Sequence, residues 1–306
     1  MLTFRGGRKT IVTGAALVLA ASVFQPAAGD EYRSQPKTRA RAATPAIETT
    51  NFRIYGISRL PNAQAIAGDF EKSRGSLCGM WLGGRALPDW SPKCDVVIHA
   101  AAASYARAVG QDQFATIGSS RVDVRGGRIT LRRLDIRADN PGWFAAAVPH
   151  ELTHLVMADE FAGGEVPAWA DEGMAVLADT PAKQSLHQRD FELGRRTGGV
   201  FRLAHFVSQT SYPTAAEIPV FYGQSVSLVG FLVDRRSAAD FVRFLHLAEK
   251  EGYDAALRQI YGLHGVHLLE REWLASTFPR PNMLTAETAQ DRDSAIVDVL
   301  VTATTP

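Results

Sequence analysis

The chain is 306 residues long, which is enough for two domains of about 150 residues or for one larger α+β domain with loose ends. Hydrophobic residues make up 46% of it and charged residues 21%, the composition of an ordinary globular protein with a substantial core. The 33 basic and 32 acidic side chains leave a formal net charge of +1, so no electrostatic surface for nucleic acid is indicated. We find no repeat at a fixed period, which excludes repeat architectures.

The first 29 residues have the pattern of a secretory signal peptide. Arg5, Arg8 and Lys9 precede a largely apolar, uncharged run that ends at residue 24, and small residues follow. An uncleaved membrane anchor is the alternative, but this run is short for a bilayer that needs about 20 residues. We therefore expect export to the periplasm or the extracellular space, with no stable membrane insertion after cleavage.

Cys78 and Cys94 are the two cysteines of the chain. In an oxidising compartment such a pair is most simply a disulfide, and a loop of this size would stabilise the fold by about 3 kcal/mol. Two buried free thiols are the alternative. Because the pair lacks a Cys-x-x-Cys spacing, we do not expect it to bind zinc.

The rest of the chain divides into three parts. Residues 30–50 are polar and lack apolar periodicity, so we expect a flexible linker, and residues 279–306 are expected to form a polar C-terminal tail. Residues 51–278 between them suit one folded domain. This domain should begin with a strand at 52–57, a helix around 66–81 and a second strand at 95–99.

Gly126-Gly127 indicates a hairpin turn, followed by a strand over residues 129–136. Arg132 and Arg133 interrupt the alternation of that strand, so we expect a bulge or an edge position rather than a central one. The chain after residue 136 is predicted to be mainly helical, with helices near 143–158, 167–179, 185–194, 221–235, 237–250, 253–261 and 266–276. A small mixed sheet followed by helices is an α+β pattern.

The most informative motif is HELTH at residues 150–154, inside an expected helix. Residues four apart share a helix face with Cβ atoms about 6 Å apart, so the imidazoles of His150 and His154 can converge on one metal ion. Glu151 is offset by about 100° around the helix and can reach a water held by that ion. Zinc would lower the pKa of the water to about 7, and Glu151 would take its proton as the water attacks a carbonyl carbon. Pro149 either kinks this helix or marks its start.

A catalytic zinc site needs a third protein ligand, and the run PAWADEGMA at residues 167–175 offers one. Its proline suits the first turn of a helix, and its small residues would let that helix approach the first one closely. Asp171 and Glu172 point about 100° apart on such a helix, so only one of them can be the ligand.

Together the two motifs resemble the thermolysin-like gluzincins, and most closely the peptidase-MA-like families, whose helix pair reads His-Glu-x-x-His and then Pro-x-Trp-x-x-Glu-Gly-x-Ala. The resemblance covers roughly residues 95–276 and is most specific over 148–178. It implies a zincin-like fold, one zinc ion held by His150, His154 and Glu172, and Glu151 as the catalytic base. The metzincin pattern fits less well, because its further glycine and histidine are absent.

The resemblance also implies a tyrosine or histidine that follows the glutamate ligand and donates a hydrogen bond to the developing oxyanion. We assign this role to Tyr222, although a core tyrosine on an amphipathic helix is the alternative; His205 is a second candidate. Asp159 and Asp179 could orient a ligand histidine, with solvated charges at helix ends as the simpler interpretation.

In zincin folds the edge strand ahead of the active-site helix binds extended peptide, which by resemblance would place residues 129–136 along the substrate. Arg132 or Arg133 could then bias the enzyme towards acidic groups.

We therefore predict an exported zinc-dependent metallopeptidase that hydrolyses peptide or protein substrates. Its fold would be α+β and zincin-like, with a small mixed β-sheet and an active-site helix followed by a mainly helical C-terminal half. The alternative is a non-catalytic zinc-containing envelope protein that binds peptides or stabilises an assembly. Glu151 argues against it, since a purely structural site needs no general base. Hydrolysis of a non-peptide amide would use the same residues.

Overall fold

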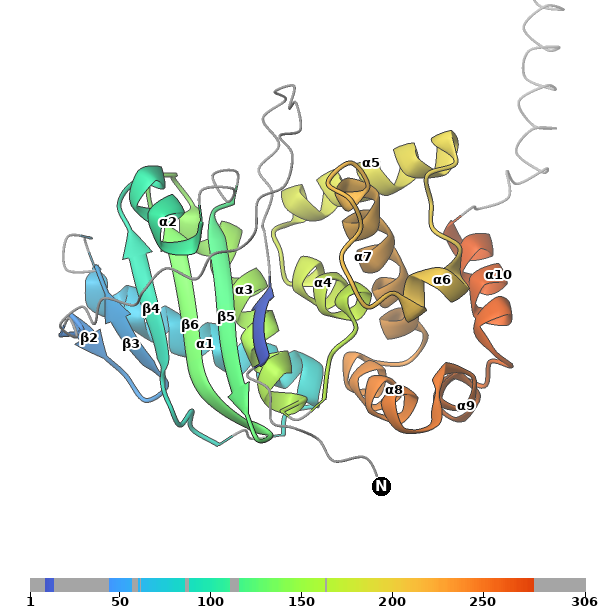
Figure 1. The fold of residues 1–306 in the computed structure, drawn as a ribbon, viewed down its shortest axis with the longest axis horizontal. Coiled ribbons are helices and arrows are strands. Elements are labelled where there is room, and N and C mark those ends of the chain that lie inside the picture. Colours follow the sequence, from blue (N-terminus) through green and yellow to red (C-terminus); the bar gives the residue numbers. More distant parts are fainter. Residues whose placement is uncertain are drawn as a thin grey trace, which may run out of the picture.

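The protein combines a β-sheet half with a helical half, as a computed structural model shows (Figure 1). The structure describes residues 9–13, 44–56, 60, 62–85, 88–110, 116–162 and 164–277. The sheet and its covering helices come first in the chain, and the remaining helices follow. The predicted α+β class is confirmed, and the predicted C-terminal tail lies outside the described residues.

The sheet has six strands in the order β1-β5-β6-β4-β3-β2. In chain order these are β1 (Lys9–Thr13), β2 (Ile47–Glu48), β3 (Phe52–Tyr55), β4 (Cys94–His99), β5 (Gly118–Arg125) and β6 (Arg128–Arg137). Strands β3, β4 and β6 run parallel to one another, whereas β1, β5 and β2 pair antiparallel with their neighbours. The sheet is therefore mixed, as predicted.

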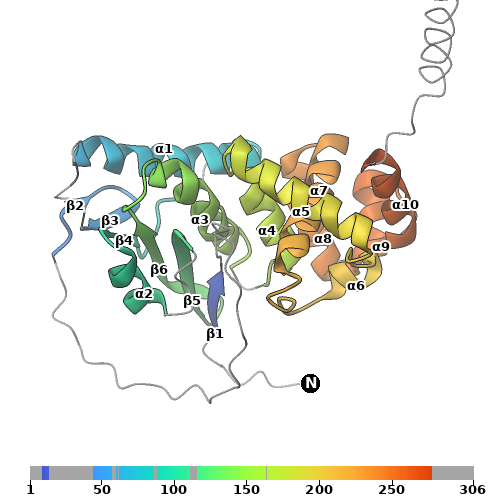
Figure 2. The ribbon, with the colours of Figure 1, turned by 90° about the horizontal axis from the view of Figure 1, so that it is seen from above.

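Helices cover the sheet unequally (Figure 2). The long helix α1 (Ala63–Leu82) and the helix α3 (Trp143–Glu160) lie against one face, while the short helix α2 (Ala102–Val109) lies on the other. Phe52 of β3 and Phe70 of α1 are both fully buried, and their rings lie 5.5 Å apart. The face that carries α1 and α3 thus contains the core of this half.

The helical half packs around α7 (Ile218–Arg235), against which α4 (Ala168–Leu177) and α5 (Pro181–Thr197) both lie. The other elements are α6 (Leu203–Ser208), α8 (Ala238–Glu251), α9 (Tyr253–Ala256), the π-helical turn η3 (Leu257–Tyr261) and α10 (Val266–Thr277). A Cβ on Gly173 would meet the Ser225 carbonyl oxygen at 2.7 Å, so this glycine lets α4 approach α7 rather than α3. Among the described residues, no helix has the length and apolar character needed to cross a bilayer.

The predicted hairpin is present. Of the two alternatives predicted for its second strand, the edge position is wrong, whereas the β5–β6 pairing does contain an irregularity, where its register shifts between Asp123 and Val124. β6 lies inside the sheet, paired with β5 on one side and β4 on the other. Its two arginines point to opposite faces, and each has its own carboxylate: Arg132 pairs with Asp159 and Arg133 with Asp135. Because both charges are compensated, the strand tolerates a central position, and neither arginine is free to select acidic substrates.

The linker predicted for residues 30–50 is shorter than expected at its C-terminal end. Ile47 and Glu48 form β2, which pairs with β3. The Thr49 hydroxyl donates to Glu71 Oε1 at 2.7 Å, and the backbone N–H of Asn51 donates to the same atom at 2.7 Å. A two-residue strand has too little periodicity to be recognised in a polar sequence.

Both cysteines are buried free thiols, so the predicted disulfide does not form in this structure. Cys78 lies on α1 and Cys94 opens β4. Each contributes to the apolar core between helix and sheet, and burial raises the pKa of both thiols. Both side chains thus serve as small apolar residues of the core.

Candidate metal centre

The helix α3 carries the two predicted histidine ligands on one face. It continues without interruption through Pro149, and the Thr153 hydroxyl donates to the Pro149 carbonyl oxygen at 2.8 Å. The imidazoles of His150 and His154 have ring centroids 5.0 Å apart and are 1% and 2% exposed. The spacing of four residues has therefore placed two buried nitrogen ligands side by side, as the motif predicts.

The helix α4 brings Glu172 to the same point. Glu172 Oε2 lies 3.7 Å from His150 Nε2 and 3.9 Å from His154 Nε2, distances too long for hydrogen bonds. Each of these three residues offers a ligand atom within 4.8 Å of the others. Within the described part of the chain, none of the three facing atoms has a hydrogen-bond partner.

This arrangement fits a metal ion. Three buried polar atoms without partners would be costly in a closed core, whereas a cation between them would satisfy all three. Two imidazoles and one carboxylate are also the protein ligands of many catalytic zinc sites. The sequence left open whether Asp171 or Glu172 is the third ligand. The structure brings Glu172 to the Nε2 atoms of the two histidines.

Two further carboxylates contact the histidines at Nδ1, the ring nitrogen that does not face the common point. Asp179 Oδ2 lies 3.0 Å from His150 Nδ1, and Asp171 Oδ2 lies 2.9 Å from His154 Nδ1. Lys183 Nζ in turn donates to Asp179 Oδ1 at 2.7 Å. His150 Nδ1 is hydrogen-bonded and His154 Nδ1 lies in ion-pair contact, so each imidazole has a carboxylate at Nδ1 and presents Nε2 to the common point. Asp159, the other candidate for this task, pairs instead with Arg132.

The electrostatics of the site favour positive charge. Burial alone would lower the pKa of His150, but the charge of Asp179 and its hydrogen bond raise that pKa to about 10. Burial would likewise raise the pKa of Glu172, yet the two imidazoles hold it below its usual value. A metal ion that binds here must displace protons, so its affinity should depend on pH.

Glu151 lies beside this cluster and is fully buried. Burial raises the pKa of its carboxyl group, against the opposing effect of the neighbouring imidazoles. A Cβ on Gly118, the first residue of β5, would meet Glu151 Cγ at 2.8 Å, so only glycine lets the strand backbone pass this close. The start of β5 therefore lies directly against the Glu151 side chain.

Two tyrosines approach the site in different ways. Tyr222 of α7, the predicted oxyanion donor, is buried, and its ring stacks on His187 with centroids 5.5 Å apart. Tyr212 contacts a ligand directly, because its hydroxyl donates to Glu172 Oε1 at 2.6 Å. Tyr212 was not predicted from the sequence, because it lies in a polar segment between helices. Its only signal was that it is a tyrosine downstream of the glutamate ligand.

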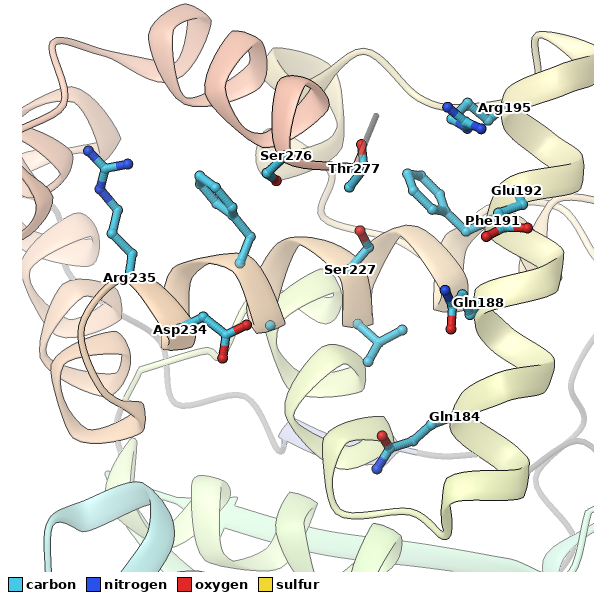
Figure 3. A pocket seen from close by; sticks show the side chains of 13 residues that line it. Gln184, Gln188, Phe191, Glu192, Arg195, Ser227, Asp234, Arg235, Ser276 and Thr277 are labelled. Carbon is cyan, nitrogen blue, oxygen red and sulfur yellow. The ribbon is translucent and has the colours of Figure 1, made fainter. Parts of the chain in front are cut away.

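A cavity of about 780 Å³ lies between α5, α7 and α10 (Figure 3). Its lining includes Phe191 and the charged side chains of Glu192, Arg195, Asp234 and Arg235. None of its lining residues is a candidate metal ligand or Glu151. The cavity is therefore separate from the buried cluster.

Comparison with known proteins identifies the class. A family model described as the peptidase MA superfamily matches residues 127–278, a range that contains α3, α4 and the three candidate ligands. Over these residues the chain belongs to the peptidase MA superfamily, and its α+β architecture agrees with a zincin-like fold. This superfamily is typically metal-dependent, and the match suggests a metallopeptidase. No curated protein and no solved structure matches the chain.

Proposed function

We propose that the protein is a zinc-dependent metallopeptidase in which His150, His154 and Glu172 hold one zinc ion and Glu151 is the general base. One observation carries the proposal: three buried ligand atoms face one point, within the described residues they lack hydrogen-bond partners, and a buried glutamate lies next to them. The donor set of two imidazoles and one carboxylate supports zinc as the metal.

When bound, zinc would polarise the scissile carbonyl and lower the pKa of a water molecule to about 7. Glu151 would accept the proton of the attacking water and pass it to the nitrogen of the leaving amine. Burial raises the pKa of this carboxyl group, which makes it a better acceptor of the proton of the water. Asp171 and Asp179 would keep the two imidazoles oriented throughout.

For the substrate we propose the edge of β5, in place of the strand at residues 129–136. β5 begins beside Glu151, and its outer edge forms antiparallel pairs with Lys9–Thr13. That edge can thus accept an extended segment, which is how an edge strand binds peptide. The segment that pairs with it here belongs to the predicted signal peptide, so cleavage would leave the edge available.

The residue that stabilises the developing oxyanion is also a matter of proposal. The family resemblance favours Tyr222, which would donate a hydrogen bond to the carbonyl oxygen as it becomes negative. We further propose that the protein is exported, on the strength of the basic and apolar pattern of residues 1–29.

The test compares the zinc-loaded protein with its Glu151→Gln variant on a diverse peptide library, with the cut bonds mapped by mass spectrometry. The variant keeps the shape of the side chain and all three ligands but cannot accept a proton. We expect cleavage by the wild type and a loss of at least about 10²-fold in the variant, at equal zinc content. Equal cleavage by both proteins would contradict the assigned base, and no cleavage by either would favour a peptide-binding protein.

A further inference from the structure

The two carboxylate oxygens of Glu172 have different surroundings. Oε2 faces the Nε2 atoms of His150 and His154, while Oε1 accepts a hydrogen bond of 2.6 Å from the Tyr212 hydroxyl. A hydroxyl donor at this distance from a carboxylate is a short, charge-assisted hydrogen bond. One oxygen is thus engaged by the protein, and the other is left for a ligand.

Tyr212 reaches this oxygen from outside the helices that carry the ligands. It lies in the segment between α6 and α7, is 38% exposed, and packs its ring on Phe221 with centroids 5.7 Å apart. The segment is fastened at the start of α7, where the Thr214 hydroxyl donates to Glu217 Oε2 at 2.6 Å. The tyrosine is therefore held both by its ring and by its backbone segment.

A glutamate ligand needs such support more than a histidine does. Its side chain turns about three single bonds, and a carboxylate can bind a cation through one oxygen or through both. The histidines are oriented by Asp179 and Asp171. Tyr212 performs the equivalent task for Glu172, because its hydroxyl donates a hydrogen bond to that carboxylate.

We propose that Tyr212 is a positioning residue that keeps Glu172 a one-oxygen metal ligand. By engaging Oε1 it offers only Oε2 to the ion, and so preserves the open coordination position that a catalytic site requires. The inference rests on the proposed metal site but not on the identity of the substrate.

The experiment measures zinc affinity by competition with a coloured chelator, and the visible absorption of the Co²⁺-substituted protein. It uses the full chain, its Tyr212→Phe variant and one matched variant, Tyr55→Phe. Tyr55→Phe removes a hydroxyl on the far face of the sheet, where it donates to Asp95 at 3.4 Å. Phenylalanine at position 212 keeps the ring contact with Phe221, and thermal unfolding of the metal-free proteins checks that the fold is intact.

We expect Tyr212→Phe to weaken zinc binding by about 10–100-fold, the usual effect of removing a residue that orients a metal ligand. Its Co²⁺ absorption should lose intensity, because a carboxylate that binds through both oxygens raises the coordination number. Tyr55→Phe should leave the dissociation constant within twofold of the wild type. A dissociation constant for Tyr212→Phe equal to or below the wild-type value, or an unchanged Co²⁺ spectrum, overturns the inference and leaves the proposed function standing. Failure of the wild type to bind zinc overturns both.

Discussion

The helix α3 carries two buried polar clusters that differ in one respect. At its C-terminal end Asp159 pairs with Arg132, which is 3% exposed and lies over the Trp90 ring at 5.1 Å. In its middle, His150 and His154 face Glu172 across distances of 3.7 and 3.9 Å. In the first cluster each charge is paired with an opposite charge of the protein. In the second, the three facing atoms have no hydrogen-bond partner among the described residues and can bind a ligand. Burial of polar groups is thus common to both, and the convergence of three unpartnered ligand atoms on one point is what marks a binding site.

The largest effect on stability is expected at the closed cluster, the ion pair of Asp159 and Arg132. Asp159→Asn would leave the Arg132 charge buried and uncompensated, and we expect it to lower the free energy of unfolding by about 3–5 kcal/mol. Urea denaturation measures this change, provided that the slope of the transition stays the same. The double variant Arg132→Met, Asp159→Leu should recover most of the loss. A single-variant effect below about 1 kcal/mol would show that the pair is not structural.

Removal of the metal should have the next largest effect on stability. It should act only through the open cluster, which is formed by His150, His154 and Glu172. Zinc at about 100 times its dissociation constant would stabilise the fold by about 2.7 kcal/mol. For a domain of this size that corresponds to roughly 5–10 °C in Tm, measurable by calorimetry with and without a chelator. Asp159→Asn should respond to the chelator as the wild type does, and His150→Ala should not respond. A wild type indifferent to chelation contradicts the account.

Glu172→Gln is the matched change at the open cluster, and we expect a smaller effect on the metal-free protein, about 1 kcal/mol or less. Oε2 has no hydrogen bond to lose among the described residues, and the glutamine carbonyl can still accept from Tyr212. The same variant should lose its response to zinc. Urea denaturation of the metal-free protein gives the comparison, and a loss as large as that of Asp159→Asn would remove the distinction between the clusters.

The smallest effect on stability is expected at Glu71, a carboxylate that accepts hydrogen bonds from neutral groups. Burial would raise its pKa, but hydrogen bonds from Thr49 and Asn51 outweigh burial and hold the pKa below the usual 4.5. Because the folded-state pKa is lowered, Glu71 stabilises the fold above pH 4.5, and this contribution is lost as the pH falls through the folded value. Glu71→Gln should therefore cost about 1 kcal/mol at neutral pH and nothing in strong acid. Urea midpoints measured across this range test it, and a cost that does not change with pH would count against the assignment.

The parts of the site that could be predicted are those set by one helix or by one motif. His150 and His154 share a face because of their spacing, and the motif around Glu172 identified the second helix. Tyr212 could not be found in this way, since it reaches the site from another part of the chain through tertiary packing. Asp179 was one of two candidates to orient a histidine, and only the packing distinguishes it from Asp159, which pairs with Arg132.

The fold shows the same limit. The strand after Gly126-Gly127 was predicted, but its central position was not, because the sequence does not show that Arg132 meets Asp159 across 27 residues. The disulfide prediction failed for a related reason. Cysteine number and a predicted export signal say nothing about whether two thiols face each other, and here both thiols serve as core residues.

The central claim is that the open cluster on α3 and α4 binds a metal ion. Its most direct test is the metal content of the purified protein, measured by inductively coupled plasma mass spectrometry after saturation with zinc and removal of the excess. We expect one zinc ion per chain in the wild type and less than about a tenth of that in the His150→Ala, His154→Ala double variant, while Asp159→Asn retains the full amount. Equal zinc in the wild type and the double variant, or none in the wild type, would contradict the claim.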